Sequence, residues 1–234
     1  MIEVRELSKL YGDFRAVDSL SFDVPAGEVL GLVGPNGAGK TTTLRCLAGI
    51  IPPSGGRIRI GGHDIKDDPV EAKRLVSFIP DEPKLFEYLT VEEHLRFVCR
   101  LYGVDGMKSA AATLLEELEL TGREKALPLE LSRGMKQKLS IACGLIHDPR
   151  VIIFDEPLTG LDPAGIRRMK QTIAARAAAG CAILISSHLL SLVEEICHRV
   201  LILDGGKKIV HGTLEEISKD ASLEEIFFKV TKTS

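Results

Sequence analysis

The chain has 234 residues, of which 44% are hydrophobic, and this is enough for one globular domain with a substantial core. Its 30 basic and 33 acidic residues leave a formal net charge of -3, so there is no basic field that would bind nucleic acid. No apolar run approaches the roughly 20 residues that span a bilayer, and the N-terminus has no apolar core of signal-peptide length. These features favour a cytosolic protein that binds no nucleic acid and crosses no membrane.

Residues 1–65 carry an alternating pattern that is typical of half-buried strands. Leu20 and Phe22 alternate with polar neighbours, and Ile58 and Ile60 do the same further along the chain. Antiparallel sheets commonly leave one face in contact with water, and such a sheet produces this alternation. The pattern therefore predicts an N-terminal antiparallel β subdomain.

A continuous apolar run at residues 29–33 predicts a parallel strand that is buried on both faces. The sequence Gly-Pro-Asn-Gly-Ala-Gly-Lys-Thr-Thr follows, and then a helical pattern begins, which is the context of a phosphate-binding loop. In such a loop backbone N–H groups surround phosphate oxygens, Lys40 adds positive charge at the β and γ phosphates, and the Thr41 hydroxyl is placed for Mg²⁺. The predicted phosphate-binding residues are Gly34, Pro35, Asn36, Gly37, Ala38, Gly39, Lys40, Thr41 and Thr42.

Residues 84–149 change to the periodicity of helices. Thr90 and Glu93 form a capping box that begins one helix, and Gly103 ends it. A second helical pattern follows, with leucines gathered on one face. The region therefore predicts an α-helical subdomain, about residues 84–149, inserted between strands of the core.

Two acidic residues, Asp155 and Glu156, follow a buried apolar strand at residues 151–154. Ligands bind at the carboxyl ends of strands in open α/β sheets, so these carboxylates are expected beside the phosphate loop. Asp155 can hold Mg²⁺ through water, and Glu156 can polarise an attacking water. Alone, the pair would be interpreted as solvated acids at a strand end, but the phosphate loop favours the catalytic interpretation.

Two more buried strands are predicted at residues 182–185 and 200–203, and His188 follows the first of them. This position is within reach of the same phosphates, although a lone histidine after a strand is often a polar loop residue. Before this strand, Asp162 begins a helix as its N-cap with Pro163 at the first helical position. Strands alternating with helices predict the α/β class, here a P-loop NTPase with a mainly parallel central sheet.

Several motifs occur in a fixed order over nearly the whole chain, namely residues 34–42, 131–137 and 151–157, a Gly-Leu-Asp-Pro sequence and His188. In this order and spacing they resemble the nucleotide-binding subunit of an ATP-binding cassette (ABC) transporter. The phosphate loop alone is shared by kinases and GTPases, but the combination is not. The resemblance implies a single ABC ATPase domain over residues 1–234, with ATP and Mg²⁺ as cofactors.

By the same resemblance, two nucleotide-binding subunits meet head to tail. Each ATP then lies between the phosphate loop of one chain and residues 131–135 of the other, and the second chain can be identical or different. The resemblance also implies a membrane permease subunit as a separate chain. The protein would accordingly be cytoplasmic and peripheral on the inner face of the cell membrane.

The resemblance assigns further residues to the nucleotide. Ser132 would then cap no ordinary helix, because its hydroxyl and the N–H groups after it would point across the interface at the partner's γ-phosphate, and Gly134 would let the backbone approach closely. Asp162 would bridge the dimer, and His188 would contact the γ-phosphate. Tyr11 would stack on adenine, although an aromatic residue after a first strand is otherwise typical of packing. An N-capped surface helix is the alternative for Ser132.

The sequence departs from the family at three positions. Arg133 and Met135 stand where the family has glycine and glutamine, yet both leave the backbone donors intact, and the variant resembles that of exporter-type cassettes. Asp81 stands where the family has a glutamine that senses Mg²⁺ and water. Its oxygen can ligate Mg²⁺, but its charge would lower nucleotide affinity. The alternative is a plain loop acid.

The sequence therefore predicts an ATPase that drives export through a permease. The predicted catalytic residues are Lys40, Glu156 and His188, and the predicted Mg²⁺ ligands are Thr41, Asp81 and Asp155. One alternative is a cassette that regulates a membrane or cell-envelope partner without transport. Another is a P-loop kinase or GTPase, but the chain has no Asn-Lys-x-Asp guanine-reading motif, and neither class explains Leu-Ser-Arg-Gly-Met.

Overall fold

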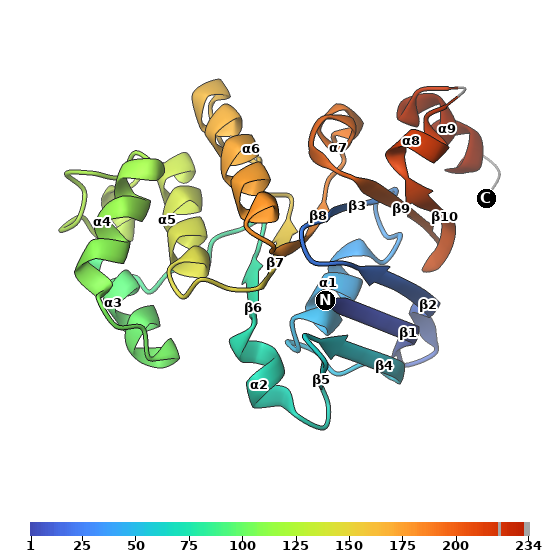
Figure 1. Ribbon diagram of the computed structural model, residues 1–234, viewed down its shortest axis with the longest axis horizontal. Helices are drawn as coiled ribbons and strands as arrows, with labels where there is room; N and C mark the ends of the chain where they lie inside the picture. Colours follow the sequence, from blue (N-terminus) through green and yellow to red (C-terminus); the bar gives the residue numbers. More distant parts are fainter. Residues whose placement is uncertain (220, 232–234) are drawn as a thin grey trace.

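The computed structural model describes residues 1–219 and 221–231 (Figure 1). The strands are β1 (Ile2–Tyr11), β2 (Phe14–Val24), β3 (Val29–Val33), β4 (Gly55–Ile60), β5 (His63–Asp64), β6 (Val76–Ile79), β7 (Val151–Asp155), β8 (Ala182–Ser186), β9 (Arg199–Asp204) and β10 (Lys207–Thr213). The helices are α1 (Lys40–Leu47), α2 (Pro69–Arg74), α3 (Val91–Tyr102), α4 (Met107–Glu117), the 3₁₀ helix η1 (Pro128–Glu130), α5 (Arg133–Leu145), α6 (Pro163–Ala178), α7 (Leu190–Ile196), α8 (Leu214–Ile217) and α9 (Leu223–Thr231). Strands and helices are both abundant, which confirms the α/β class.

The strands form two sheets. The four-stranded sheet is antiparallel and has the order β2-β1-β4-β5, whereas the six-stranded sheet has the order β10-β9-β3-β8-β7-β6. In the larger sheet β9, β3, β8, β7 and β6 run parallel, and only β10 pairs antiparallel, with β9. The predicted N-terminal antiparallel sheet and mainly parallel central sheet are thus confirmed.

The larger sheet is covered on both faces. Alternate residues of a strand point to opposite faces, and along β7 Ile152 and Phe154 join the core cluster that contains α3 to α6. Val151 and Ile153 join the cluster that contains α1 and the antiparallel sheet. Because neither face meets water, every residue of β7 is buried, and the strand has a continuous apolar sequence up to its final aspartate.

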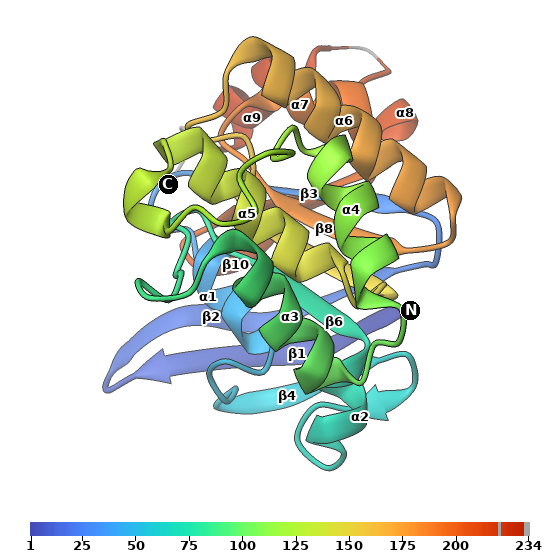
Figure 2. The same ribbon diagram turned by 90° about the vertical axis from the view of Figure 1, so that its left-hand side faces the viewer.

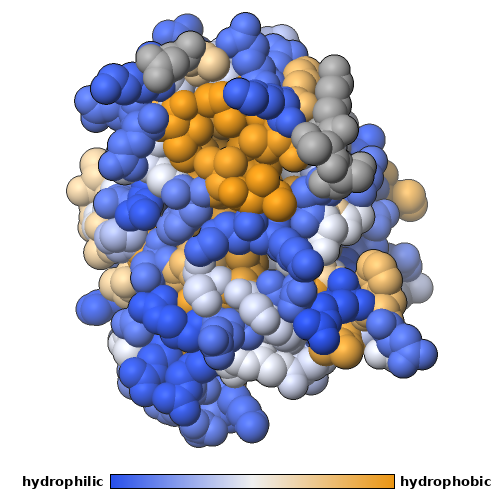
Figure 3. Space-filling model, turned by 90° about the vertical axis from the view of Figure 1, so that its right-hand side faces the viewer, coloured by the Kyte–Doolittle hydropathy of each residue, from blue (hydrophilic) through white to orange (hydrophobic). Residues whose placement is uncertain are grey.

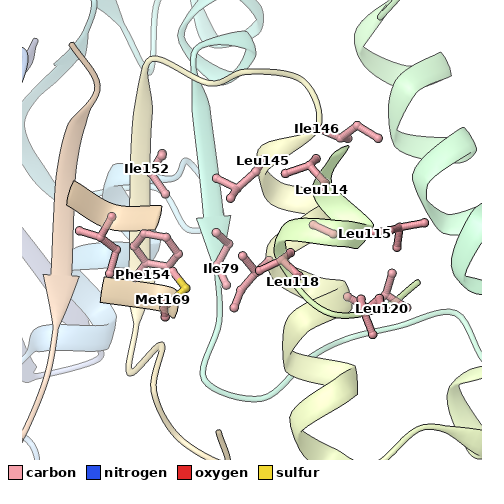
Figure 4. Close-up of a cluster of buried hydrophobic side chains, with 14 of the residues drawn as sticks. Ile79, Leu114, Leu115, Leu118, Leu120, Leu145, Ile146, Ile152, Phe154 and Met169 are labelled. Atoms are coloured by element: carbon pink, nitrogen blue, oxygen red, sulfur yellow. The ribbon is translucent and has the colours of Figure 1, made fainter. Parts of the chain in front are cut away.

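Helices α3, α4 and α5 gather on one side of the molecule, in front of the sheet in Figure 2. Figure 4 shows how they are anchored, with Leu114 and Leu118 from the α4 region and Leu145 of α5 lying near Ile79 of β6 and Phe154 of β7. All five side chains are at most 4% exposed. Burial of one such side chain contributes roughly 1.5–3 kcal/mol. This cluster therefore fixes the helices firmly to β6 and β7.

The helix boundaries predicted from capping residues are confirmed. Thr90 and Glu93 form the capping box of α3, and Gly103 ends this helix in the left-handed conformation with φ of 68°. Asp162 caps α6, and Pro163 occupies its first position. The sequence analysis missed α2 and β6, because elements of 6 and 4 residues are too short to display a period.

The C-terminal elements form a separate side of the molecule. Figure 3 shows an apolar surface where α8 and α9 lie, at the opposite end of the long axis from α3 to α5 in Figure 1. Beneath it Leu223 is fully buried in a small cluster with Val193 and Val200. Within residues 1–219 and 221–231, no helix combines the length and the apolar character that crossing a membrane requires.

Candidate functional site

The loop between β3 and α1 has the backbone of a phosphate-binding loop. Gly37 and Gly39 have φ of 83° and 97°, values that glycine adopts without strain. A Cβ on Gly34 would lie 2.4 Å from the carbonyl oxygen of Leu203, and one on Gly39 would lie 2.5 Å from that of Ala16. Glycine is therefore required where the loop passes between β9 and β2.

Lys40 begins α1, and its side chain folds back over the loop. Its Nζ donates to the carbonyl oxygens of Gly34 at 2.6 Å and Pro35 at 3.1 Å. Burial lowers the pKa of Lys40, while the carboxylates of Glu156 and Asp155 oppose that shift. The ammonium group is thus held at the loop, between backbone carbonyls and two carboxylates, where it can meet phosphate oxygens.

Two oxygens of the kind that Mg²⁺ prefers lie side by side next to the loop. Thr41 Oγ1 is 3.4 Å from Oδ1 of Asp155, whose residue is only 6% exposed. Ser186 of β8 stands in register with Asp155 and donates its hydroxyl to the same Oδ1 at 2.6 Å. A hydroxyl and a carboxylate beside a phosphate site fit Mg²⁺, which is usually held by one or two protein oxygens and the substrate phosphates.

Glu156 lies just beyond β7 with φ of 50°, a left-handed conformation that is uncommon for residues other than glycine. Its N–H donates to the carbonyl oxygen and to the hydroxyl of Ser186, each at 3.2 Å. Its Oε2 is 2.8 Å from Nδ1 of His188. Burial raises the pKa of Glu156, and His188 and Lys40 act in the opposite direction. Strained backbone of this kind concentrates at functional sites.

A cavity of about 340 Å³ joins these residues. Residues 36–42, Asp155 and Glu156 form one part of its lining, and the aromatic rings of Tyr11 and Phe14 form another. Tyr11 is 50% exposed and Phe14 is 65% exposed, so neither ring belongs to the core. Exposed aromatic faces beside a phosphate-binding loop are suited to stacking on a base.

Ser132 and Asp162 do not line this cavity, and both cap helices. The Ser132 hydroxyl accepts from the N–H of Met135 at 3.2 Å, and Oδ1 of Asp162 accepts from the N–H of Gly165 at 2.9 Å. Ser132 therefore caps α5 within the single chain, and its role toward a partner's γ-phosphate stays a prediction. A hydroxyl that accepts one hydrogen bond still has its own proton to donate, so capping leaves Ser132 able to meet a phosphate.

The lack of a side chain at Gly134 also has a structural cause within its own chain. A Cβ at this position would lie 3.0 Å from the carbonyl oxygen of Gly160, in the turn that precedes α6. The sequence analysis attributed the missing Cβ to the approach of a phosphate alone. The structure adds a second cause, the close packing of α5 on this turn.

Asp81 follows β6 in the loop that begins at Pro80. It is exposed and does not line the cavity. The preceding Pro80 accepts a hydrogen bond through its carbonyl oxygen from Nε2 of Gln137 at 3.4 Å, and this ties the loop to α5. Gln137 is 1% exposed, and its Oε1 has no partner within residues 1–219 and 221–231. The role of Asp81 toward Mg²⁺ stays a prediction.

The sequence analysis missed two residues of the site, Ser186 and Phe14. Ser186 could have been found, because it directly follows the apolar run at residues 182–185, just as Asp155 follows its own apolar strand. Phe14 carries no such signal, since an aromatic residue at the start of a strand usually packs. Only the pairing of Tyr11 with Phe14 across the β1–β2 hairpin brings the two rings to the same end of the sheet.

The fold and the loop geometry define a P-loop nucleotide-binding protein, and comparisons with known proteins give its family. The family model described as ABC transporter matches residues 17–159. The chain is 34% identical over 239 residues to the ABC-type transporter ATP-binding protein EcsA of Bacillus subtilis (strain 168), covering 99% of this chain and 97% of the relative. It is 40% identical over 213 residues to the Nod factor export ATP-binding protein I of Paraburkholderia xenovorans (strain LB400), covering 90% and 70%.

Solved structures agree with this assignment. The structure of an ATP-binding subunit of an ABC transporter matches with a TM-score of 0.94 and 36% identity over 98% of this chain and 99% of that one. The fold is also that of the dimeric cassette MJ0796 bound to ADP and Pi, with a TM-score of 0.83 and 23% identity over 92% and 99%. The chain belongs to the ABC transporter family as an ATP-binding subunit, and it is an ATPase.

Proposed function

We propose that this chain is the ATP-hydrolysing subunit of an exporter, in which two subunits close around two Mg-ATP molecules and drive a separate membrane permease. Family membership supports ATP binding and hydrolysis. The Nod factor export relative and the Leu-Ser-Arg-Gly-Met variant support export. The observation that carries the proposal is the division of the site. Lys40, Asp155 and Glu156 share one cavity, whereas Ser132 and Asp162 do not line it.

Within one chain, each residue has a proposed role that follows from its contacts. Lys40 neutralises charge on the β and γ phosphates, and Thr41 and Asp155 hold Mg²⁺. When bound between these two residues, Mg²⁺ would supply positive charge to the phosphates. Glu156 accepts a hydrogen bond from the attacking water, and His188, 2.8 Å from its carboxylate, steadies that carboxylate and contacts the γ-phosphate.

The second chain contributes the N-terminus of its α5. Acidic residues are favoured in the first turn of a helix, but this one has none. Lys136 lies one turn after Ser132. This electropositive helix end, with its unpaired N–H groups, suits the γ-phosphate held by the other chain. Asp162, at the start of the next helix, is proposed to lie in the same interface.

A groove of about 540 Å³ is the surface that we propose for the permease. Phe86 and Leu101 lie along it and are 55% and 68% exposed. Its charged lining residues include Arg45 and Lys84, and no carboxylate lines it on the described part of the chain. A permease segment with apolar anchors and acidic groups would fit this groove. We propose that the helical subdomain, about residues 84–149, forms one wall and places the protein at the cytoplasmic face of the membrane.

Two variants test the division of the site. Glu156→Gln keeps the size of the side chain and removes its charge, so ATP should bind and persist while turnover falls by about 100-fold or more. Size-exclusion chromatography should then show an ATP-dependent dimer. Adding Ser132→Asp keeps a good N-cap residue but places a carboxylate against the partner's γ-phosphate. The double variant should bind ATP and stay monomeric.

The control places the same charge at another helix. Ser222 accepts from the N–H of Glu225 at the start of α9, so Ser222→Asp in the Glu156→Gln background should still dimerise. Gly134→Asp is less suitable because its Cβ would meet the carbonyl oxygen of Gly160. If the variant with Ser132→Asp dimerises on ATP, the two-chain site is contradicted.

A further inference from the structure

The turn between β7 and α6 connects Glu156 to Asp162, and several different contacts hold it in place. The N–H of Thr159 donates to the carbonyl oxygen of Glu156 at 3.2 Å, which closes the turn on itself. Leu158 is 6% exposed and secures one side of the turn in the core. Gly160 has φ of 80° and no side chain of its own. The backbone closes this side of the turn as well, since the N–H of Leu161 donates to the carbonyl oxygen of Leu158 at 3.2 Å, and packing onto the glycine adds to that hydrogen bond.

Arg133, the first residue of α5, covers Gly160. A Cβ placed on Gly160 would lie 3.0 Å from Nε, 3.2 Å from Cδ and 3.3 Å from Cγ of Arg133. One position along, a Cβ on Gly134 would lie 3.0 Å from the carbonyl oxygen of Gly160. The two glycines let α5 and the turn approach closely, and the stem of Arg133 fills the space that a side chain at Gly160 would take.

The charge of Arg133 does not account for its place at the start of α5. A cation is unfavourable at a helix N-terminus, and the first turn has no acidic residue to offset it. The guanidinium lowers the pKa of Glu82, but Lys84 does so more strongly. Arginine stems pack on neighbouring groups, and Cγ and Cδ of Arg133, together with Nε, pack on Gly160 in this way.

We propose that Arg133 is a positioning residue for Glu156. By covering Gly160 it holds the turn against α5, and this keeps the carboxylate at the other end of the turn beside His188. The inference rests on the role proposed above for Glu156. It means that a residue of the segment 131–135 acts within its own chain, although the segment is proposed to face the partner chain.

Steady-state ATPase kinetics of Arg133→Ala and Arg133→Met separate the stem from the charge. Alanine removes the stem, so kcat should fall about 10-fold, because small displacements of a reacting group are costly. The KM for ATP should change by less than about 2-fold, since the phosphate loop is intact. Methionine keeps an unbranched stem without the charge and should bring kcat to within about 3-fold of wild type. The Tm values should match that of the wild type.

A double-mutant cycle tests the contact itself. Gly160→Ala should lower kcat because the new Cβ meets Arg133. In the Arg133→Ala background this clash is gone and only the strain of the positive φ remains, so the further loss should be smaller than in wild type. Strictly multiplicative losses in kcat would contradict a direct contact.

Two results for the single variants would also overturn the inference. One is a wild-type kcat for Arg133→Ala. The other is an Arg133→Met variant as slow as Arg133→Ala together with Arg133→Lys at the wild-type rate, because charge and not packing would then be responsible. Normal hydrolysis by Glu156→Gln would instead contradict the role of Glu156, so the two failures are distinguishable.

Discussion

The phosphate loop and the start of α5 are both helix N-termini suited to an anion, yet they are built differently. At α1 the N-cap is Gly39, no side chain caps the helix, and Lys40 lies over the loop. At α5 the hydroxyl of Ser132 already accepts a hydrogen bond from the N–H of Met135. The first leaves its backbone donors for a ligand, whereas the second is stabilised without one.

This difference explains why one half of the site can be recognised in a single chain and the other cannot. The half at α1 has the cavity, the lysine and two carboxylates converging on one point. The half at α5 is a capped helix that acquires a ligand only when a second chain brings a phosphate to it. Variants in each half of the site can test this asymmetry.

The largest effect is expected from Lys40→Ala. Removing the ammonium group deletes positive charge at the β and γ phosphates, so hydrolysis should fall by at least about 100-fold. The fold should persist, because Nζ bonds only to loop carbonyls. ATPase assays with circular dichroism check both points, and Lys108→Ala on the exposed face of α4 is the matched control. Turnover at the wild-type level would contradict the assignment of this loop to the ATP-hydrolysing site.

Tyr11→Ala should have an intermediate effect. Loss of a stacking partner for adenine should cost about 1 kcal/mol, or roughly 5-fold in ATP affinity, whereas Tyr11→Phe should bind normally. Phe14→Ala tests in the same way, through ATP affinity, whether the second ring in the cavity stacks on adenine. Equal affinities in a fluorescent-nucleotide titration would show that neither ring touches the base.

Ser132→Ala addresses the other half of the site. Loss of the N-cap should destabilise the protein by about 1 kcal/mol, which is roughly 2–4 °C in Tm for a chain of this size. ATP binding by the single chain should not change, because Ser132 does not line its cavity. If ATP affinity falls as it does for Lys40→Ala, the two halves are not separate, and the comparison above fails.

The smallest effect concerns Glu156 and pH. Its pKa is raised in the folded chain by burial, so its contribution favours the fold at low pH and is lost as the pH rises through the folded pKa. Glu156→Gln should therefore raise the Tm near pH 7.5 and leave it unchanged near pH 4. A lower Tm for the variant at the higher pH would mean that the contact with His188 outweighs burial.

Many structural features of this protein can be predicted from short stretches of its sequence. The apolar run at residues 29–33, the glycines after it and the acidic pair after residues 151–154 predicted a nucleotide site before any coordinates, and the capping box at Thr90 predicted where α3 begins. The capping box depends on contacts within a few residues, whereas the role of the acidic pair was inferred only together with the phosphate loop, which is distant in the sequence.

The tertiary structure determined which residues of different elements lie next to one another. Only the register of β7 with β8 places Ser186 beside Asp155. Only the packing of α5 on the turn before α6 shows that a Cβ at Gly134 would meet the carbonyl oxygen of Gly160. Thus the sequence by itself determined the phosphate loop, the class of fold and the family resemblance. The exposure of Tyr11 and the packing of Arg133 on Gly160 came from the fold, because contacts between residues far apart in the chain leave no periodic pattern in the sequence.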